Sequence, residues 1–273
     1  MGRSLRRKMS VSCELNGEEQ REILDAAMQA GHILLENGAE IFRVEETVDR
    51  ICRYYGIESE NAFVLSNGIF ITSGSTREEI FAKVQHIPVS GVHLNRVAAV
   101  NQLSREIVEG RYTIGEVRER LDEIRVMPGK TKTMQILASG VGSACFCMLF
   151  GGNLTDSAAF VSGVLLYFYV LYISGPHLSK IVGNIGGGAL VTFLCSVMYL
   201  FSIGQHLNFM IIGSIMPLIP GVAFTNAIRD IADGDYISGS VRMLDALLVF
   251  FCIAMGVGLV FSVFHQLTGG VML

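Results

Sequence analysis

The first part of the chain carries apolar residues at helical spacing. From Glu18 to Tyr55 they recur every three or four positions, which gives each of two helices one apolar stripe. The two stripes consist of Ile23, Ala27, Ala30 and Leu34, and of Ile41, Val44, Val48, Ile51 and Tyr55. Gly38 lies between them and fits the turn that follows a helix. The pattern therefore predicts two amphipathic helices joined at Gly38.

The next segment changes from helical spacing to short runs rich in β-branched and aromatic residues. Residues 62–66 and 69–73 form two such runs, and Asn67-Gly68 joins them. Asn-Gly at this place predicts a hairpin, because both residues tolerate positive φ. Residues 80–86 alternate well enough to predict a third strand.

Helical spacing returns after these strands, at Val97, Val100, Leu103 and Ile107. Thr113 and Glu116 form a capping box, which opens a last helix with Val117, Leu121 and Ile124 facing inward. Pro128-Gly129 then breaks the chain. We therefore expect a flexible N-terminus over residues 1–17 and a small α+β domain over residues 18–130, large enough for its own core.

The remaining sequence, residues 131–273, is dominated by long uncharged apolar runs. A helix that crosses a bilayer needs about 20 such residues. The break at Gly204-Gln205-His206 divides the longest run into two. The sequence thus predicts an α-helical integral membrane domain with five spans, at about 134–153, 157–175, 181–202, 207–224 and 243–264.

The basic residues near these spans all fall on one side of the predicted topology. They are Lys130, Lys132, Lys180, Arg229 and Arg242. The positive-inside rule assigns that side to the cytoplasm. We therefore expect a multi-pass membrane protein with its N-terminus in the cytoplasm and its C-terminus outside.

Composition agrees with this division of the chain. Only 17% of the 273 residues are charged, whereas soluble domains average about 25%. Residues 134–273 hold just three basic and five acidic residues. The formal net charge of −4 shows no basic excess, so nucleic acid is a poor candidate partner.

The richest chemistry lies at the end of the predicted fourth span. Pro217 and Pro220, followed by Gly221, cannot keep a regular helical hydrogen-bond ladder. At membrane depth a broken ladder is tolerated only where it is buried in protein or lines a wet cavity. Broken helices of this kind hold substrates in secondary transporters. Thr225 and Asn226 follow directly and offer a hydroxyl and an amide.

Charged residues continue this segment. Arg229 could grip a substrate carboxylate through two hydrogen bonds. Asp230, Asp233 and Asp235 could hold Arg229 or Arg242, receive an amino group or carry a proton. The alternative interpretation is a cytoplasmic loop with solvated charges. Asn184 in the third span is a further candidate for substrate binding, or a polar contact between helices.

Several other features have structural interpretations. Glycines at 183, 186, 187, 188, 256 and 258 predict close helix packing, with helix hinges as the alternative. Asp156 is interpreted as a helix N-cap in a short outer loop, and His206 as an interfacial residue. The sequence contains no phosphate-binding loop, zinc motif or nucleophile elbow, so we expect no cofactor and no metal.

Carboxylates in the soluble domain leave an enzymatic interpretation open. Glu45 and Asp49 share one helix face, and so do Glu46 and Arg50. They could serve acid–base catalysis, or be a solvated face with ion pairs. Glu40, Arg43 and Glu46 could instead dock this domain on the membrane half and gate it. A sensor or scaffold is a third possibility, although one span would suffice for an anchor.

Motifs along nearly the whole chain resemble the threonine/serine exporter family. They are Gly38-Ala39-Glu40-Ile41-Phe42-Arg43-Val44-Glu45-Glu46-Thr47, Gly68-Ile69-Phe70, Gly91-Val92-His93-Leu94, Val100-Asn101-Gln102-Leu103-Ser104-Arg105, and Pro220-Gly221 through Asp230 followed by Gly234-Asp235, Ser238-Gly239 and Arg242. One departure is His93, where the family has Asn more often.

The resemblance implies a non-enzymatic transporter subunit of the bacterial inner membrane. Some family members are single chains with about ten spans, and others are split into a large subunit with the soluble domain and a small membrane subunit. This chain resembles the large subunit, which implies a small membrane partner or self-association. Export of threonine and serine driven by the proton gradient is the expectation, with dicarboxylates such as succinate as the alternative.

Overall fold

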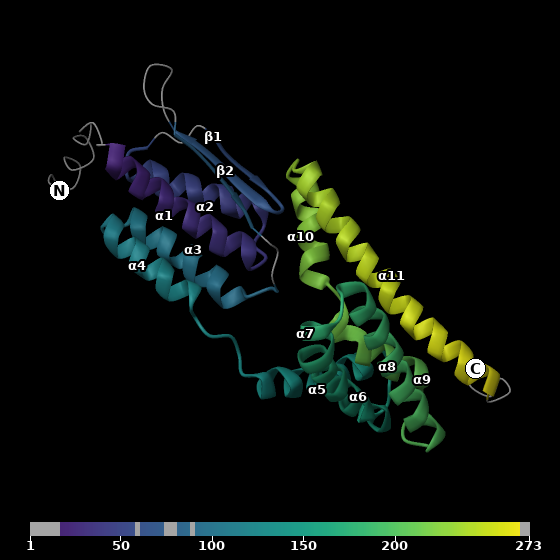
Figure 1. Ribbon diagram of the computed structural model, residues 1–273. Helices are drawn as coiled ribbons and strands as arrows, with labels where there is room; N and C mark the ends of the chain where they lie inside the picture. Colours follow the sequence, from purple (N-terminus) through teal and green to yellow (C-terminus); the bar gives the residue numbers. More distant parts are fainter. Residues whose placement is uncertain (1–16, 58–60, 74–80, 88–90, 268–273) are drawn as a thin grey trace. The chain divides into compact units, whose positions relative to one another are not determined.

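The computed structural model describes residues 17–57, 61–73, 81–87 and 91–267 (Figure 1). The chain divides into two compact units. The N-terminal unit comprises residues up to 129 together with 222–243, and the helical unit comprises 130–221 together with 244–273. The predicted flexible segment 1–17 lies outside the described residues except for Gly17, which begins the first helix.

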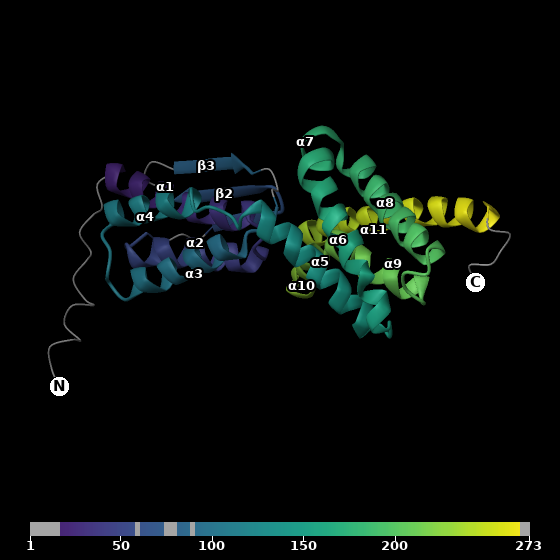
Figure 2. The ribbon, with the colours of Figure 1, turned by 90° about the horizontal axis from the view of Figure 1, so that it is seen from below.

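The N-terminal unit combines helices with one small sheet. Its helices are α1 (Gly17–Glu36), α2 (Ile41–Tyr54), α3 (Leu94–Val108), α4 (Ile114–Arg125), most of α10 (Gly221–Ala232) and the first residues of α11 (Tyr236–Leu267). Its strands are β1 (Asn61–Leu65), β2 (Gly68–Ser73) and β3 (Phe81–His86). Figure 2 shows the sheet along one side of helices α1–α4. The elements expected between residues 18 and 125 are all present.

The apolar stripes read from the sequence form the core of this unit. Ile23, Leu34, Val44 and Val48 are each at most 3% exposed, and so are the other stripe members except the half-buried Tyr55. The α1–α2 turn follows the expected form. Gly38 has φ +83°, its amide donates to the carbonyl of Leu35, and the Ala39 amide donates to that of Leu34. This pair of bonds is a Schellman motif, which favours glycine at the left-handed position.

The three strands form an antiparallel sheet in the order β1-β2-β3. Leu65 pairs with Gly68, so the two loop residues of the hairpin are Ser66 and Asn67. Neither Asn67 nor Gly68 has positive φ, so the expectation based on Asn-Gly backbone freedom was wrong in detail. The third strand supports the turn instead, because the Ile87 amide donates to the Asn67 carbonyl at 2.8 Å.

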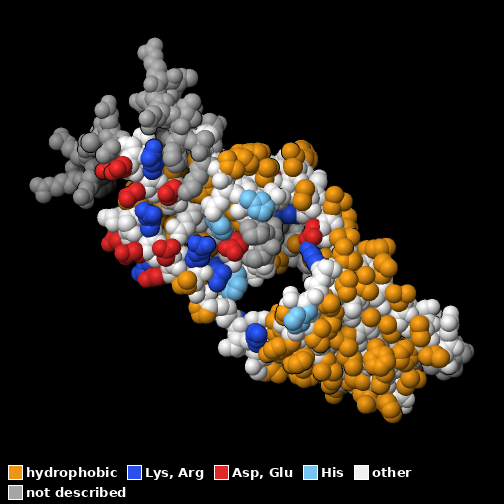
Figure 3. Space-filling model, viewed as in Figure 1, with side chains coloured by type: hydrophobic (Ala, Val, Ile, Leu, Met, Phe, Trp, Pro, Cys, Tyr) orange, Lys and Arg blue, Asp and Glu red, His pale blue; other side chains and the backbone are white. Residues whose placement is uncertain are grey.

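The helical unit contains short and long apolar helices. They are α5 (Lys132–Leu149), the 3-10 turn η1 (Leu154–Ala158), α6 (Ala159–Tyr169), the π turn η2 (Val170–Ser174), α7 (Gly175–His177), α8 (Lys180–Leu200), α9 (Leu207–Ile215), the 3-10 turn η3 (Met216–Leu218) and the remainder of α11. Hydrophobic side chains cover the face of this unit that is visible in Figure 3.

Within the described residues, three helical segments are long and apolar enough to cross a membrane: Leu154–His177, Lys180–Leu200 and Tyr236–Leu267. A fourth is obtained if the pair Leu207–Leu218 and Gly221–Ala232 counts as one broken span. The first expected span falls on α5, which has only 18 residues and includes Lys132 and Gln135. The structure therefore supports a helical membrane protein, and five spans remain a prediction.

The interruption expected at the two prolines is present. Helix α9 ends at Ile215, and η3 continues only to Leu218. Ile219 is extended, with φ −66° and ψ 124°, because the residue before a proline is disfavoured in the helical region. Helix α10 then begins at Gly221, directly after Pro220.

Glycines bring helix backbones of this unit close together. A Cβ atom at Gly256 would lie 2.1 Å from the Ile185 carbonyl oxygen of α8, and one at Gly188 would lie 2.6 Å from the Ile253 carbonyl oxygen of α11. Gly213 of α9 likewise faces the backbone of α5. The packing interpretation therefore holds for Gly188 and Gly256, whereas Gly258 has nothing within 4 Å of its Cβ position.

Candidate functional site

Residues of α10 and α11 meet the turn between α1 and α2. We call this set the corner cluster: Gly38, Ala39, Glu40, Ile41, Asn226, Arg229, Asp230 and Arg242, all within the N-terminal unit. The Asn226 side-chain amide donates to the Gly38 carbonyl at 2.9 Å. The Arg242 guanidinium donates to the Ala39 carbonyl at 3.2 Å. The carbonyls of Gly38 and Ala39 in the turn thus accept hydrogen bonds from side chains about 190 residues or more away in the chain.

Asp230 is the buried centre of the corner cluster. Its carboxylate is 1% exposed and accepts a hydrogen bond from Arg242 at 2.8 Å, whose side chain is 12% exposed. The other carboxylate oxygen accepts the Ile41 amide at 3.2 Å. The Ile41 amide belongs to the first turn of α2, where a negative charge also meets the positive end of the helix dipole. Of the partners considered for Asp230, the structure selects Arg242.

Arg229 and Glu40 form the exposed side of the corner cluster. The Arg229 guanidinium contacts the Glu40 carboxylate at 2.5 Å, with side-chain exposures of 55% and 18%. Arg43 approaches the same carboxylate at 3.3 Å. This arrangement places a carboxylate on the guanidinium that we expected to receive one from a substrate.

The other expected site residues lie as follows. Thr225 precedes Asn226 on α10, and Asp235 stands before α11, where its backbone amide donates to the Asp230 carbonyl at 2.8 Å. Glu46 pairs with Arg50 along α2 and is not part of the corner cluster. Asn184 belongs to the helical unit, and its amide donates to the Lys180 carbonyl one turn earlier, at 2.8 Å. Asn184 therefore makes a local helix contact.

The helical unit contains a hollow of about 510 Å³ next to the interrupted segment. It is lined by Gln135, Ala138, Ser139, Gly142, Phe146, Tyr167, Met216, Pro217, Ile219 and Gly221. Tyr167 donates its hydroxyl hydrogen to Gln135 at 3.2 Å, and Ser139 donates to the Gly163 carbonyl at 2.9 Å. The interruption at Pro217 and Ile219 thus borders a mostly apolar recess with a few polar groups.

The carboxylates considered for catalysis border a second hollow, of about 600 Å³, along α2. Glu45 accepts the Val64 amide at 3.1 Å, and burial raises the pKa of Glu45 although this bond opposes the shift. Asp49 pairs with Arg53 at 3.2 Å, and Arg50 reaches both Glu46 and Ser104. Paired charges at helical spacing favour the interpretation as an ion-paired surface face.

The part of the chain that the structure describes holds no group of three His, Cys, Asp or Glu side chains able to bind a metal ion.

The interpretation of Asp156 as a helix N-cap missed its long-range contacts. Asp156 is completely buried and accepts hydrogen bonds from residues about 50 positions away. Its isolation was the available signal, because it is the only acidic residue between positions 134 and 229.

Comparison with known proteins agrees with the helical architecture. The family model described as "Putative threonine/serine exporter" matches residues 25–264. The chain is 24% identical to the "Probable succinate transporter subunit YjjP" of Klebsiella aerogenes, over 88% of this chain and 93% of that protein. The protein of the same name from Escherichia coli is also 24% identical, over 88% and 94%.

A third relative is the "Probable threonine/serine exporter" of Mycobacterium tuberculosis, 20% identical over 92% of this chain and 48% of that protein. No solved structure matches the chain. The protein is thus a transporter with several apolar helices of a multi-pass membrane protein. It belongs to the threonine/serine exporter family.

Proposed function

We propose that this chain is one subunit of a secondary exporter for small carboxylates, threonine and serine foremost, with dicarboxylates such as succinate as the alternative. Its relatives carry both substrate names. A carboxylate is common to all these solutes, so the receiving group should be a cation that can bind one. Arg229 has the required chemistry, since guanidinium binds carboxylates in bidentate geometry.

The observation that carries the proposal is the pair between Arg229 and Glu40. It supports a carboxylate-binding role because a carboxylate already occupies this guanidinium, while more than half of the Arg229 side chain stays exposed. Glu40 then competes with substrate for Arg229, and the corner cluster acts as a gate on the cytoplasmic side, separate from any gate at the outer end. Asn226 and Thr225 supply the amide and hydroxyl for the amino and hydroxyl groups of threonine.

Several further features complete the proposal. The predicted basic loops place the N-terminal unit in the cytoplasm of a bacterial cell. A small membrane subunit completes the pathway, which accords with the word "subunit" in two relatives and with the larger size of the mycobacterial one. The proton gradient is the proposed energy source, and the sequence contains no nucleotide-binding motif that would indicate ATP instead.

The test is counterflow of labelled threonine, serine and succinate in vesicles that contain the chain with and without its small partner. Arg229→Ala should abolish counterflow of every transported solute, and Asn226→Ala should strongly reduce threonine counterflow. Arg53→Ala removes another, 73% exposed arginine from the same unit and should leave transport unchanged. Normal counterflow by Arg229→Ala at equal expression would refute the site.

A further inference from the structure

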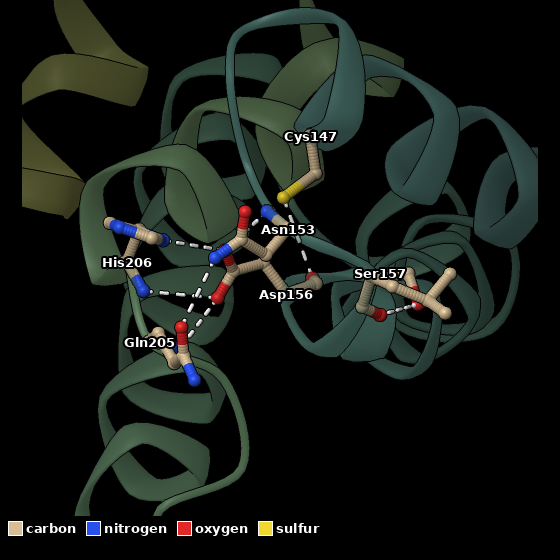
Figure 4. Close-up of polar contacts among 7 residues, drawn as sticks. Cys147, Asn153, Asp156, Ser157, Gln205 and His206 are labelled. Carbon is tan, nitrogen blue, oxygen red and sulfur yellow. Dashed lines mark hydrogen bonds and ion pairs between the residues drawn. The ribbon is translucent and has the colours of Figure 1, made fainter.

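Asp156 is a buried carboxylate with four hydrogen-bond donors directed at it (Figure 4). The backbone amides of Asn153, Gln205 and His206 donate to it at 2.7, 2.5 and 3.0 Å. The His206 ring nitrogen Nδ1 lies 2.8 Å from the second carboxylate oxygen. A buried carboxylate needs such compensation, because taking it out of water without partners is costly.

These bonds exceed what a helix cap requires. The capping box at η1 involves only Asn153 and Asp156, whereas Gln205 and His206 belong to the turn between α8 and α9. Asn153 adds a second tie, donating its side-chain amide to Gln205 at 3.1 Å. We call these four residues the Asp156 clasp. It fastens the turn after α5 to the turn before α9.

The backbone on both sides is shaped to fit the clasp. Gly204 has φ +97°, and a Cβ there would lie 2.4 Å from the Met210 sulfur and 3.3 Å from an Asp156 oxygen. A Cβ at Gly152 would lie 2.9 Å from the Cys147 carbonyl oxygen and 3.3 Å from the Asp156 Cβ. The turns at Gly152 and Gly204 therefore leave space for the Asp156 side chain, because neither glycine has a Cβ atom that would crowd it.

The 510 Å³ hollow runs along helices whose other end carries the clasp. In α5, the residues that line the hollow run from Gln135 to Phe146, and the next residue, Cys147, contacts the Asp156 carbonyl. In α6, Asp156 precedes the first residue while Tyr167 near the end lines the hollow. In α9, His206 stands before the helix and Met216 after it. The hollow thus extends along α5 as far as the residue before Cys147, and the clasp ties the helices together beyond that point.

We propose that the Asp156 clasp is the closed gate of the solute pathway, and that the structure is the state open at the end of the hollow. This inference rests on the proposed transport function. Secondary transporters alternate between openings on the two sides of the membrane. With Lys130 and Lys132 on the cytoplasmic side, the hollow faces inward and the clasp closes the outer end. Asp156 acts as a positioning residue, since it holds the turns and not the solute.

The experiment measures access to the hollow and needs no substrate. Ala138→Cys places a thiol in the hollow, and a membrane-impermeant maleimide is applied to right-side-out and inside-out membrane vesicles containing the full chain. Labelling of the parent chain, which has its own cysteines, is subtracted. With Asp156 present, we expect the added thiol to react from the cytoplasmic side only. Asp156→Ala should raise outer-side labelling about tenfold, the size expected from losing a hydrogen bond to a charged group.

Two further variants keep the test decisive. Asp156→Asn retains one acceptor oxygen and should give a smaller, severalfold rise. His206→Phe keeps a ring next to Phe209 and removes both ring nitrogens, including the Nδ1 that contacts Asp156, while the three backbone amides still donate, so its rise should be smaller still. Unchanged outer labelling in Asp156→Ala, or in Asp156→Asn where the alanine variant does not accumulate, overturns the proposal. So does outer labelling of Ala138→Cys in the presence of Asp156. A failed counterflow assay with intact clasp results would reject the substrate assignment alone.

Discussion

The two units are built by different packing rules. In the N-terminal unit, large side chains such as Leu24, Met28 and Ile33 fill a core that is closed to water. In the helical unit, large side chains such as Phe251 and Leu259 point outward, 63% and 60% exposed, while glycines such as Gly256 occupy the inner contacts. The apolar surface lies inside one unit and outside the other.

This difference reflects the two solvents. Water drives apolar side chains together, and the gain grows with the apolar area buried. Lipid gives helices no such gain, so they associate through close backbone approach and a few hydrogen bonds. Each unit also contains one buried aspartate, Asp230 in the N-terminal unit and Asp156 in the helical unit, and their charges are compensated differently. Asp230 is balanced mainly by the Arg242 cation, whereas Asp156 is balanced by backbone amides and His206.

The largest effect should come from removing the buried charge of the N-terminal unit. Asp230→Ala leaves Arg242 without its carboxylate, and breaking such a pair costs about 3 kcal/mol or more. We expect the free energy of unfolding of this unit to fall by about that amount. A double-mutant cycle with Arg242→Ala measures the coupling. Additive effects of the two single changes would contradict the pair.

A smaller loss of stability is expected from one added methyl group in the helical unit. Gly256→Ala puts a Cβ 2.1 Å from the Ile185 carbonyl oxygen, so α8 and α11 must separate. Overpacking of this kind costs about 2 kcal/mol. Gly258→Ala is the matched control, because nothing lies within 4 Å of its Cβ position. Thermal unfolding in detergent should distinguish the two, and equal midpoints would mean that backbone approach does not hold this unit together.

The exposed pair of the corner cluster should matter little for stability. Solvent-accessible ion pairs contribute about 1 kcal/mol at most, and Arg229 is 55% exposed although Glu40 is only 18% exposed, so Glu40→Gln should lower the free energy of unfolding by about that amount at most. The same change weakens the competitor for Arg229, and the apparent KM for exported substrate should therefore fall. Counterflow at graded substrate concentration measures this. A large loss of stability would instead identify Glu40 as part of the core.

The smallest effect concerns the pH dependence of the N-terminal unit. Burial raises the pKa of Glu45, so the folded state keeps this proton to higher pH than the unfolded state does. The free energy of unfolding therefore falls as pH rises from the ordinary glutamate range through the raised pKa. Glu45→Gln keeps an acceptor for the Val64 amide and cannot ionise. The variant should gain stability relative to the parent as the pH rises above the ordinary glutamate range, measured by denaturant unfolding. A stability difference that does not change with pH would exclude this contribution of Glu45.

Local structure was readable from the sequence because it depends on near neighbours. The stripes containing Ile23 and Val48, the left-handed Gly38 and the Thr113–Glu116 capping box all follow from spacing within one or two helical turns. The interruption before Gly221 followed from proline chemistry alone. Each of these features requires only residues close in the chain.

Long-range partners were not readable in the same way. Nothing in the spacing of Asn226 or Asp230 indicates that they bond Gly38 and Ile41, and the grouping of residues 222–243 with the N-terminal unit depends on those bonds. Asp156 has the same property, because its local role as a cap conceals its contacts with Gln205 and His206. One sequence specifies such pairs only through the folded chain.

The ion pair between Lys180 and Asp245 bears on how deeply two helices can sink into a bilayer. Lys180 is the first residue of α8, Asp245 lies in the third turn of α11, and their charged groups are 2.5 Å apart. The 32 residues of α11 extend about 48 Å, well beyond a hydrocarbon layer of about 30 Å. A charge pair resists entry into hydrocarbon, so Lys180 and Asp245 mark the depth at which both helices enter the bilayer. The part of α11 before Asp245 must therefore lie outside the hydrocarbon layer.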